Sequence, residues 1–368
     1  MTANRAFFAY SDATMSPIPA DRCIYVTESS GRLRRAVRRA VAGAGLAVAI
    51  FLPAALAAAE SPQPVATMDA AMETLRAQDA ELARAAWRLT TANAPLCDAL
   101  MPGTGLVLHA ESQYARSSLP SARRVFGFPA PLAAEWVVPD SPAARAGLKP
   151  GDGIAALNGT PVAASGTGPT SLRDETEGAL TLLPPLAALD VTYRRAGQDA
   201  SARIEPVAAC RARFEVVAGK DWLARSNGEL IQVAAGLVAQ MSDDEVAVIV
   251  AHELAHIVLH HRRRLAAAGV SKGVFAEFGK NGRLNRQAED EADRLSVVLL
   301  RNAGYDPAIG PRFFRDHSSR FGGILRSRTH ASPESRARMM EAELATIPAA
   351  AGPAWIPPLV AARDAPMR

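Results

Sequence analysis

Apolar residues recur at helical spacing between Ala66 and Leu89. Four of them stand seven residues apart, so they fall on one face of an α-helix. These residues are Met68, Leu75, Leu82 and Leu89. The pattern predicts an amphipathic helix. Because the apolar face of such a helix usually packs against the chain's own core, we assign no chemistry to it.

A different pattern runs from Glu245 to His261, where the sequence EVAVIVAHELAHIVLHH is apolar on nearly every face of a helix. Such a helix is expected to be buried. Ser242 and Glu245 form a capping box that sets its start, with acidic residues at the positive end of its dipole and arginines at the other end. The helix nevertheless carries His252, Glu253 and His256, and buried polar groups need partners.

Short apolar runs rich in β-branched residues precede this helix and predict strands at 214–217, 231–233 and 236–238. A second helical run follows it, over 285–295. Strands and helices in separate runs predict an α+β fold for this part of the chain.

The middle of the chain shows the pattern of a small β-rich domain. A strand ends at Val138, a short helix opens at Ser141-Pro142, and Gly147 stops that helix. A Pro-Gly-Asp turn, a second strand and the hairpin dipeptide Asn158-Gly159 follow. Residues 172–183 predict a second helix, and 191–194 predict a late strand.

The composition is that of an ordinary globular protein of 368 residues, with room for two modest domains and flanking segments. The net charge is +4, and much of the excess lies in one arginine cluster at 32–39. The sequence therefore carries no nucleic-acid footprint.

The arginine cluster runs into an uncharged apolar stretch at 40–56, and Ala57-Ala58-Ala59 follows. This is the order of regions in a secretory signal, which predicts export and cleavage near Ala59. The stretch is rich in alanine and interrupted by Pro53, so it is short for a membrane span. The alternative is an uncleaved inner-membrane anchor formed by residues 40–56.

The chain has three cysteines, and cleavage near Ala59 removes Cys23. Cys97 and Cys210 remain as an even pair in an exported protein, so we predict a disulfide between them. In the chain-entropy model such a bond stabilises the fold by ~4 kcal/mol. The alternative is two unrelated buried thiols.

The residues His252-Glu253-Leu254-Ala255-His256 form the HExxH motif of zinc proteases. The two histidines lie one helical turn apart and can bind one ion, while Glu253 can take a proton from a water beside it. Downstream, Glu289 and Asp293 lie one turn apart on another helix. Glu289 is the predicted third ligand, which leaves a fourth position for water, and Asp293 can accept the N–H of a ligand histidine.

Two alternatives to this site remain at the level of sequence. Glu291 is the rival for the third ligand, although it points off the face that Glu289 and Asp293 share. In the second alternative, the histidines of the motif bind no metal and are ordinary buried side chains with hydrogen-bond partners. His260 and His261, at the end of the helix, are interpreted as structural or solvent-facing.

The run from Ser141 to Ile154, SPAARAGLKPGDGI, followed by Asn158-Gly159, resembles a PDZ domain of the kind found in bacterial proteases. The resemblance implies that the sheet edge binds an extended C-terminal peptide, whose carboxylate is held by a loop. Here that loop is predicted at Phe126, Gly127 and Phe128. The alternative is a PDZ domain that serves only as a spacer or lid.

Four stretches together resemble the gluzincin family that includes the CAAX prenyl protease and HtpX, and especially its soluble periplasmic members. They are HELAH at 252–256, EDEAD at 289–293, AGYDP at 303–307 and THASPESR at 329–336. The similarity covers residues 214–345. It implies a helical zincin domain with one Zn²⁺ held by His252, His256 and Glu289.

The resemblance also implies roles for the residues around the ion. Glu253 is the general base, and Asp293 supports a ligand histidine. His330 lies near the metal, where it either stabilises the oxyanion or occupies the open position in a resting state. Arg336 matches the arginine of the same segment. Ala331 stands where the family usually has proline. The family's substrate-binding edge strand corresponds to residues 223–228.

The sequence thus predicts an α+β protein with five parts. They are an N-terminal extension with signal peptide or anchor (1–59), a helical linker segment (60–120), a PDZ domain (121–210), a zinc metallopeptidase domain (211–345) and a C-terminal tail (346–368). The predicted function is that of a periplasmic or secreted zinc endopeptidase acting on envelope proteins, with protein or peptide substrates. The competing hypothesis is a non-catalytic PDZ adaptor or chaperone-like factor with structural zinc.

Overall fold

The computed structural model describes residues 65–219, 223–270, 279–321, 331–352 and 355–367. The predicted signal or anchor at 1–59 and the predicted site residue His330 lie outside the described residues. Within them, no helix combines the length and apolar character needed to cross a membrane.

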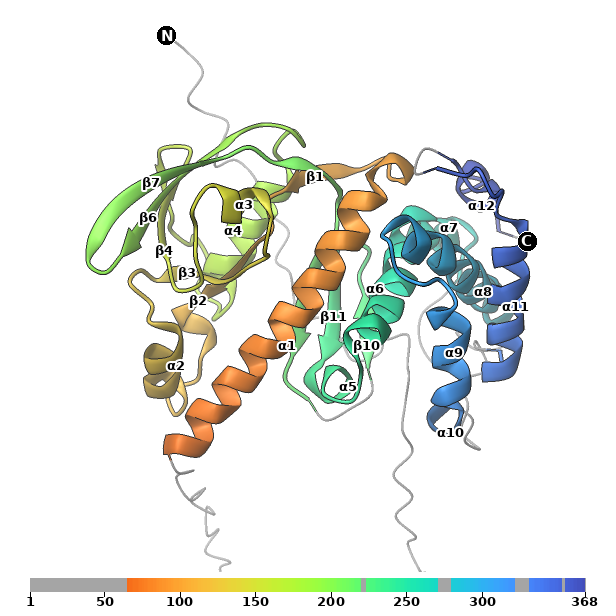
Figure 1. Ribbon diagram of the computed structural model, residues 1–368, viewed down its shortest axis with the longest axis horizontal. Coiled ribbons are helices and arrows are strands. Elements are labelled where there is room, and N and C mark those ends of the chain that lie inside the picture. The colour runs from red at the N-terminus through yellow and green to blue at the C-terminus, as the bar shows by residue number, and fades with distance from the viewer. Residues whose placement is uncertain (1–64, 220–222, 271–278, 322–330, 353–354, 368) are drawn as a thin grey trace, which may run out of the picture.

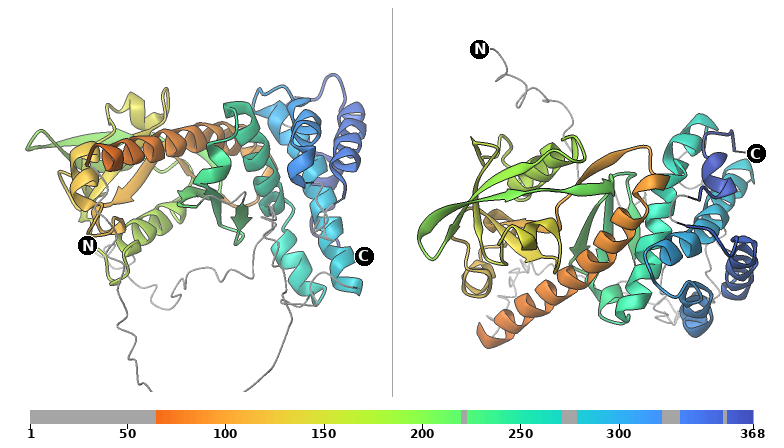
Figure 2. Two further views of the ribbon diagram at one scale, coloured as in Figure 1. Left: turned by 90° about the horizontal axis from the view of Figure 1, so that it is seen from below. Right: turned by 45° about the horizontal axis from the view of Figure 1, so that its top comes forward.

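A 28-residue helix, α1 (Val65–Ala92), runs from the β-rich part of the molecule to the helical part (Figures 1 and 2). It includes the helix expected at 66–89, and Leu82 and Leu89 are buried as that pattern required. At one end Arg124 of α2 (Leu119–Phe126) binds Asp69, and further along the helix Gln78 donates to the carbonyl of Ala235. The helix therefore ties both parts together.

The β-rich part is built on antiparallel strands in the order β2-β3-β4-β6-β7, with β5 paired to β4. Leu132, Ile154, Leu189 and Ile204 lie in its core. The strands are β2 (Leu106–Ala110), β3 (Leu132–Val137), β4 (Gly153–Leu157), β5 (Thr160–Pro161), β6 (Leu189–Arg195) and β7 (Gln198–Ile204). The sheet includes β2, which precedes residue 121. The domain boundary at 121 itself stays a prediction.

Short helices accompany this sheet. Ser141 caps α3 (Pro142–Arg145) by accepting a hydrogen bond from the backbone of Ala144, as expected for a Ser-Pro helix start. The predicted helix at 172–183 corresponds to α4 (Ser171–Thr181). Single 3₁₀ turns lie at 94–96 and 111–113.

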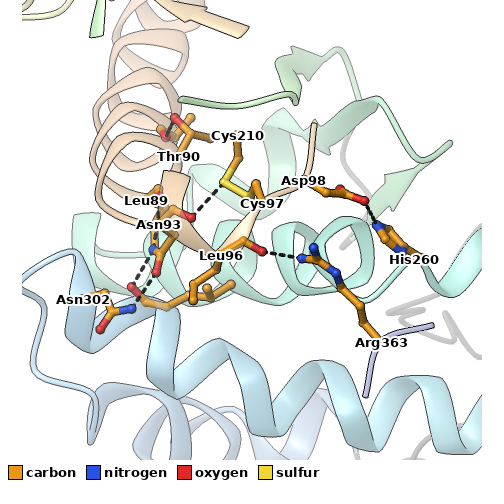
Figure 3. The surroundings of a disulfide bond; sticks show 12 residues. Leu89, Thr90, Asn93, Leu96, Cys97, Asp98, Cys210, His260, Asn302 and Arg363 are labelled. Carbon is orange, nitrogen blue, oxygen red and sulfur yellow. Dashed lines mark hydrogen bonds and ion pairs between the residues drawn. A yellow bond between two sulfur atoms is a disulfide. The ribbon is translucent and has the colours of Figure 1, made fainter. Parts of the chain in front are cut away.

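The β-rich part is inserted through a two-stranded connection. The chain enters it by β1 (Leu100–Gly103) and returns by β8 (Val207–Cys210), and these strands pair antiparallel. The sulfur atoms of Cys97 and Cys210 are bonded to each other at the base of the pair (Figure 3). Arg363 donates a 2.6 Å hydrogen bond to the carbonyl of Leu96 there, so the C-terminal segment packs against the same point.

The helical part contains a small sheet in the order β10-β11-β9. Its strands are β9 (Arg213–Val217), β10 (Ala224–Ser226) and β11 (Leu230–Ala234); β11 runs parallel to β9 and antiparallel to β10. The prediction of a strand at 236–238 is wrong, because α5 (Ala235–Val238) forms there. So short an apolar run does not distinguish a strand from a helical turn.

α1 and α6 pack against this sheet, and most of the other helices lie beyond α6 (Figure 1). The motif helix α6 packs against α8 and α1 in a core that includes Leu254, Leu295 and Leu89. The helices are α6 (Asp243–Val258), α7 (His261–Ala267), α8 (Gly279–Asn302), α9 (Ile309–Asp316), α10 (Ser318–Phe321), α11 (Pro333–Thr346) and α12 (Pro358–Ala361). The predicted α+β class is confirmed.

Candidate metal centre

The start of α6 is fixed by the capping box that the sequence predicts. The backbone N–H of Ser242 donates a 2.8 Å hydrogen bond to the carboxylate of Glu245. From there the helix runs into the core, so that His252, Glu253 and His256 are all buried. The motif therefore lies in the interior, where three polar side chains need partners.

His252, His256 and Glu289 form a buried group whose ligand atoms all lie within 4.8 Å of one another. The Nε2 atoms of the two histidines are 3.2 Å apart. Glu289 of α8 places one carboxylate oxygen 3.3 Å from His252 Nε2 and the other 3.7 Å from His256 Nε2. Ligand atoms around tetrahedral zinc are separated by about 3.3 Å, so these residues fit the ion.

Of the two candidate third ligands, Glu289 lies within the group that could hold a metal ion, and its role as a ligand stays a prediction. Glu291 instead faces the other side of α8, where its carboxylate contacts His261 and Arg264.

Asp293 lies behind His252, as its spacing predicts. Its Oδ1 is 3.0 Å from His252 Nδ1, the ring nitrogen that faces away from the ligand group. Arg336 of α11 donates hydrogen bonds of 2.6 Å to both carboxylate oxygens of Asp293. Burial by itself raises the pKa of Asp293, but the Arg336 guanidinium and these hydrogen bonds lower that pKa to about 2. Asp293 is therefore a fixed negative charge.

The charges of the group favour a cation. Burial lowers the pKa of His252, but the carboxylates of Asp293 and Glu289 outweigh it and raise that pKa to about 10. Burial holds the pKa of His256 well below its usual value. The carboxylates of Asp293 and Glu289 thus favour positive charge at His252, and a divalent ion bound to that ring could supply it in place of the proton.

Glu253 lies next to the ligand group and can accept a further hydrogen bond. Its Oε2 atom is buried and has no hydrogen-bond partner among the described residues. Burial raises the pKa of Glu253 to about 7, with a further rise from the Glu289 carboxylate and opposing effects of His252 and Arg336. A buried carboxyl with an open oxygen suits a group that accepts and returns a proton.

His261, which we expected to be structural or solvent-facing, is buried, and the sequence did not indicate its contact with His256. Its Nδ1 lies 2.8 Å from Nδ1 of His256, and only 2% of the residue is exposed. The left-handed backbone of His260, with φ of 54°, turns the chain so that His261 faces the site. In the sequence, two histidines followed by three arginines do not indicate such a turn.

In the predicted PDZ loop, two phenylalanine rings pack against His109. Phe126 ends α2, and its ring lies 4.9 Å from that of His109, between centroids. The ring of Phe128 lies 4.4 Å from the same histidine, and the N–H of Gly127 donates to the carbonyl of Arg123. Carboxylate binding by Phe126, Gly127 and Phe128 stays a prediction.

Comparison with known families agrees with both resemblances. Residues 223–283 match the model for peptidase family M48, and residues 134–178 match a PDZ domain model. The first match contains the HExxH motif, and the second contains the run from Ser141 to Ile154. The two resemblances are confirmed, and the predicted bounds of the two domains stay predictions. Glu289 and Asp293 lie beyond residue 283, so their place in the site rests on the geometry.

Two curated proteins are similar over part of the chain. The metalloprotease LoiP of Escherichia coli K12 is 31% identical over 119 residues, which is 26% of this chain and 47% of LoiP. The mitochondrial metalloendopeptidase OMA1 of Arabidopsis thaliana is 29% identical over 121 residues, 27% of this chain and 24% of OMA1. The chain thus spans less than half the length of each relative. These similarities support a metalloendopeptidase.

Proposed function

We propose that this chain is an exported zinc-dependent endopeptidase that hydrolyses peptide bonds of envelope proteins in protein quality control. The observation that carries the proposal is the buried group of His252, His256 and Glu289 with the open oxygen of Glu253 beside it. That arrangement provides three ligands and a proton acceptor at one point.

His252, His256 and Glu289 would hold the zinc ion. A bound zinc ion supplies Lewis acidity, which polarises a peptide carbonyl and makes a neighbouring water more acidic. Glu253 accepts the proton of the attacking water on its carboxylate and then delivers it to the leaving amine. Asp293 keeps the ring of His252 in place throughout, because Arg336 fixes both of its oxygens.

His330 is proposed to donate a hydrogen bond to the oxyanion of the reacting carbonyl. The proposal rests on the resemblance of residues 329–336 to the family's late histidine segment. Arg336, the last residue of that segment, donates a hydrogen bond to Asp293 beside the site, so the described end of the segment lies close to the predicted ligands.

The substrate is proposed to bind as an additional strand along β10. This strand is at one end of the order β10-β11-β9, and it packs near α6. Asn227 and Ala234 make the backbone hydrogen bonds that join the two strands at either end of β10. Because successive residues alternate in direction, the N–H groups of Ala224 and Ser226 face away from β11 and are placed to bind an extended peptide.

Export is supported by the bonded pair Cys97 and Cys210, since disulfides persist in oxidising compartments. The arginine cluster and apolar stretch before Ala59 support the same conclusion, with the periplasm as the proposed location. The PDZ region is proposed to capture C-termini of substrates. Free-carboxylate apolar peptides should then bind, and their amides should not; equal binding of both would remove this role.

The test of the catalytic proposal compares the wild type with Glu253→Gln on casein and on unfolded envelope proteins. The glutamine keeps the size of the side chain but cannot accept the proton, so hydrolysis should fall by at least about 100-fold. Zinc content, measured by metal analysis, should stay at one ion per chain, which separates loss of the base from loss of the ion. Equal turnover by the two proteins, or a wild type without zinc, would contradict the proposal.

A further inference from the structure

The helix that carries the motif ends abruptly, and the break changes what His261 can touch. α6 ends at Val258, and α7 begins at His261. On an uninterrupted helix, a residue five positions after His256 would be rotated about 140° away from it. His260 has a φ of 54°, and this left-handed residue redirects the chain. The imidazole of His261 consequently returns to that of His256, with ring centroids 4.9 Å apart.

Beyond His261 the contacts continue to a partly buried carboxylate. Nε2 of His261 lies 3.1 Å from Oε2 of Glu291. Glu291 is itself held by Arg264 of α7, at 2.6 Å, and by Gln287 one turn earlier on α8, at 2.7 Å. These contacts form a continuous path from His256 to a carboxylate whose position is fixed by two donors.

The path determines which nitrogens carry protons. Nε2 of His256 faces the other ligand atoms, so a metal at the site takes the lone pair of that nitrogen. In a neutral imidazole the proton then lies on Nδ1. That N–H points at Nδ1 of His261, 2.8 Å away, which must accept it. His261 therefore carries its own proton on Nε2 and donates it to Glu291.

His252 shows the direct form of the same arrangement, because its Nδ1 contacts the carboxylate of Asp293. Within the described part of the chain, Nδ1 of His256 meets a second imidazole rather than a carboxylate. Each of the two histidines is thus supported by a carboxylate that an arginine holds. For His252 these are Asp293 and Arg336. For His256 they are Glu291 and Arg264, which act through His261.

We propose that His261, backed by Glu291, is a positioning residue that fixes the tautomer and orientation of His256 for metal binding. The inference rests on the zinc site of the proposed function, and it assigns to His261 and Glu291 a role for which the motif alone gives no indication. Outer partners of ligand histidines orient the ring and raise its basicity, and their loss typically weakens metal binding by about 10- to 100-fold.

The experiment measures the zinc dissociation constant of the full chain by competition with a chromogenic chelator. His261→Phe keeps a ring but removes the acceptor, so the dissociation constant should rise by about 10- to 100-fold. His261→Asn offers an amide oxygen near the position of Nδ1 and should recover most of the affinity. Arg338→Met is the control; this side chain is exposed on α11, so the variant should bind zinc as the wild type does.

A second measurement does not depend on these variants folding. In long-range ¹H–¹⁵N spectra of the zinc-loaded wild type labelled at histidine, His261 should be protonated at Nε2 and His256 at Nδ1.

Glu291→Gln keeps the shape of the side chain but removes its charge, and should weaken zinc binding several-fold.

Wild-type affinity in His261→Phe, or a proton on Nδ1 of His261, would overturn the positioning role. Those results leave the proposed function standing, because the wild type still binds zinc and hydrolyses casein. Failure of the proposed function is a separate result, namely a wild type that binds no zinc or a Glu253→Gln variant that is fully active.

Discussion

Arg336 donates a hydrogen bond of 2.6 Å to each carboxylate oxygen of Asp293, across 43 residues of sequence. Arg336 comes from α11 and Asp293 from α8, and Asp293 in turn contacts the ligand histidine of α6. The guanidinium also lies over the ring of Phe314, 3.9 Å from its centroid. One buried ion pair therefore joins the last long helix of the chain to the metal site.

Replacement of this arginine tests that link. Arg336→Met fills the space but leaves the carboxylate of Asp293 buried without its charge partner, so unfolding should become easier by about 3–5 kcal/mol. Zinc affinity should fall by about 10- to 100-fold, because the orientation of His252 is no longer fixed. Urea unfolding and chelator competition measure the two effects. Arg338→Met, on the exposed side of the same helix, should change neither; equal effects of both variants would argue against the link.

The local part of the site could be predicted from the sequence. The spacing of His252 and His256, and that of Glu289 and Asp293, is a property of one helix each, so periodicity alone places each pair on one face. The preference for Glu289 over Glu291 followed from the same geometry. Arg336 followed only from family resemblance, because its contact with Asp293 depends on how α11 packs.

Features that depend on long-range pairing or on a single backbone angle could not be predicted. β2 joins the large sheet because Leu106 pairs with Val137, and periodicity does not specify such partners. His261 reaches His256 because His260 adopts a left-handed conformation, which histidine adopts only occasionally. The sequence around it would fit a continued helix equally well.

Metal binding should stabilise the fold. The folded site gathers His252, His256 and Glu289, whereas the unfolded chain does not, so zinc binds the folded state preferentially. Zinc at 1,000 times its dissociation constant should raise the free energy of unfolding by about 4 kcal/mol. Calorimetry of chelator-treated protein with and without zinc measures this. Mg²⁺ at the same concentration should have little effect, because it prefers oxygen ligands; an unfolding temperature insensitive to zinc would contradict the site.

The cysteine pair should contribute strongly to stability. Cys97 and Cys210 are 113 residues apart, so their bond closes a long loop in the unfolded chain. In the chain-entropy model, replacing both by alanine should lower the free energy of unfolding by about 4–5 kcal/mol. Urea unfolding measures the change. A reductant should destabilise the wild type by a similar amount and leave the double variant unchanged; no response of the wild type would mean that the bond is absent in the protein.

A carboxyl pair, with Glu135 buried and Asp79 partly buried, should make stability depend on pH. A side-chain hydrogen bond joins Glu135 of β3 to Asp79 of α1. Burial raises the pKa of Asp79 to about 7, and burial together with Asp79 holds the pKa of Glu135 well above its usual range, although Arg173 opposes both. The folded state therefore binds protons that the unfolded chain has released. This stabilising contribution is complete below about pH 4 and is lost as the pH rises through about 7.

Glu135→Gln removes the charge and keeps the shape, so it should leave stability unchanged at about pH 4 and increase it at about pH 8, by on the order of 1–3 kcal/mol. Urea unfolding across this range measures the difference. Glu205→Gln, at an exposed side chain, is the control. If wild type and Glu135→Gln respond to pH in parallel, the pair does not share the proton.

The edge strand β10 offers a test of how substrates bind. Ser226 accepts a hydrogen bond from the N–H of Gly228 through its side chain, while its own N–H faces away from β11. Ser226→Pro removes both hydrogen-bonding groups, and Ser226→Ala removes only the hydroxyl. If a peptide substrate pairs with this edge, the proline variant should lose about 2- to 10-fold in kcat/KM relative to the alanine variant. The loss should appear mainly in KM, because the backbone contact holds ground state and transition state alike. Zinc content should be the same in both variants. Equal kcat/KM values for proline and alanine would mean that substrates bind elsewhere, because only proline deletes the outward N–H.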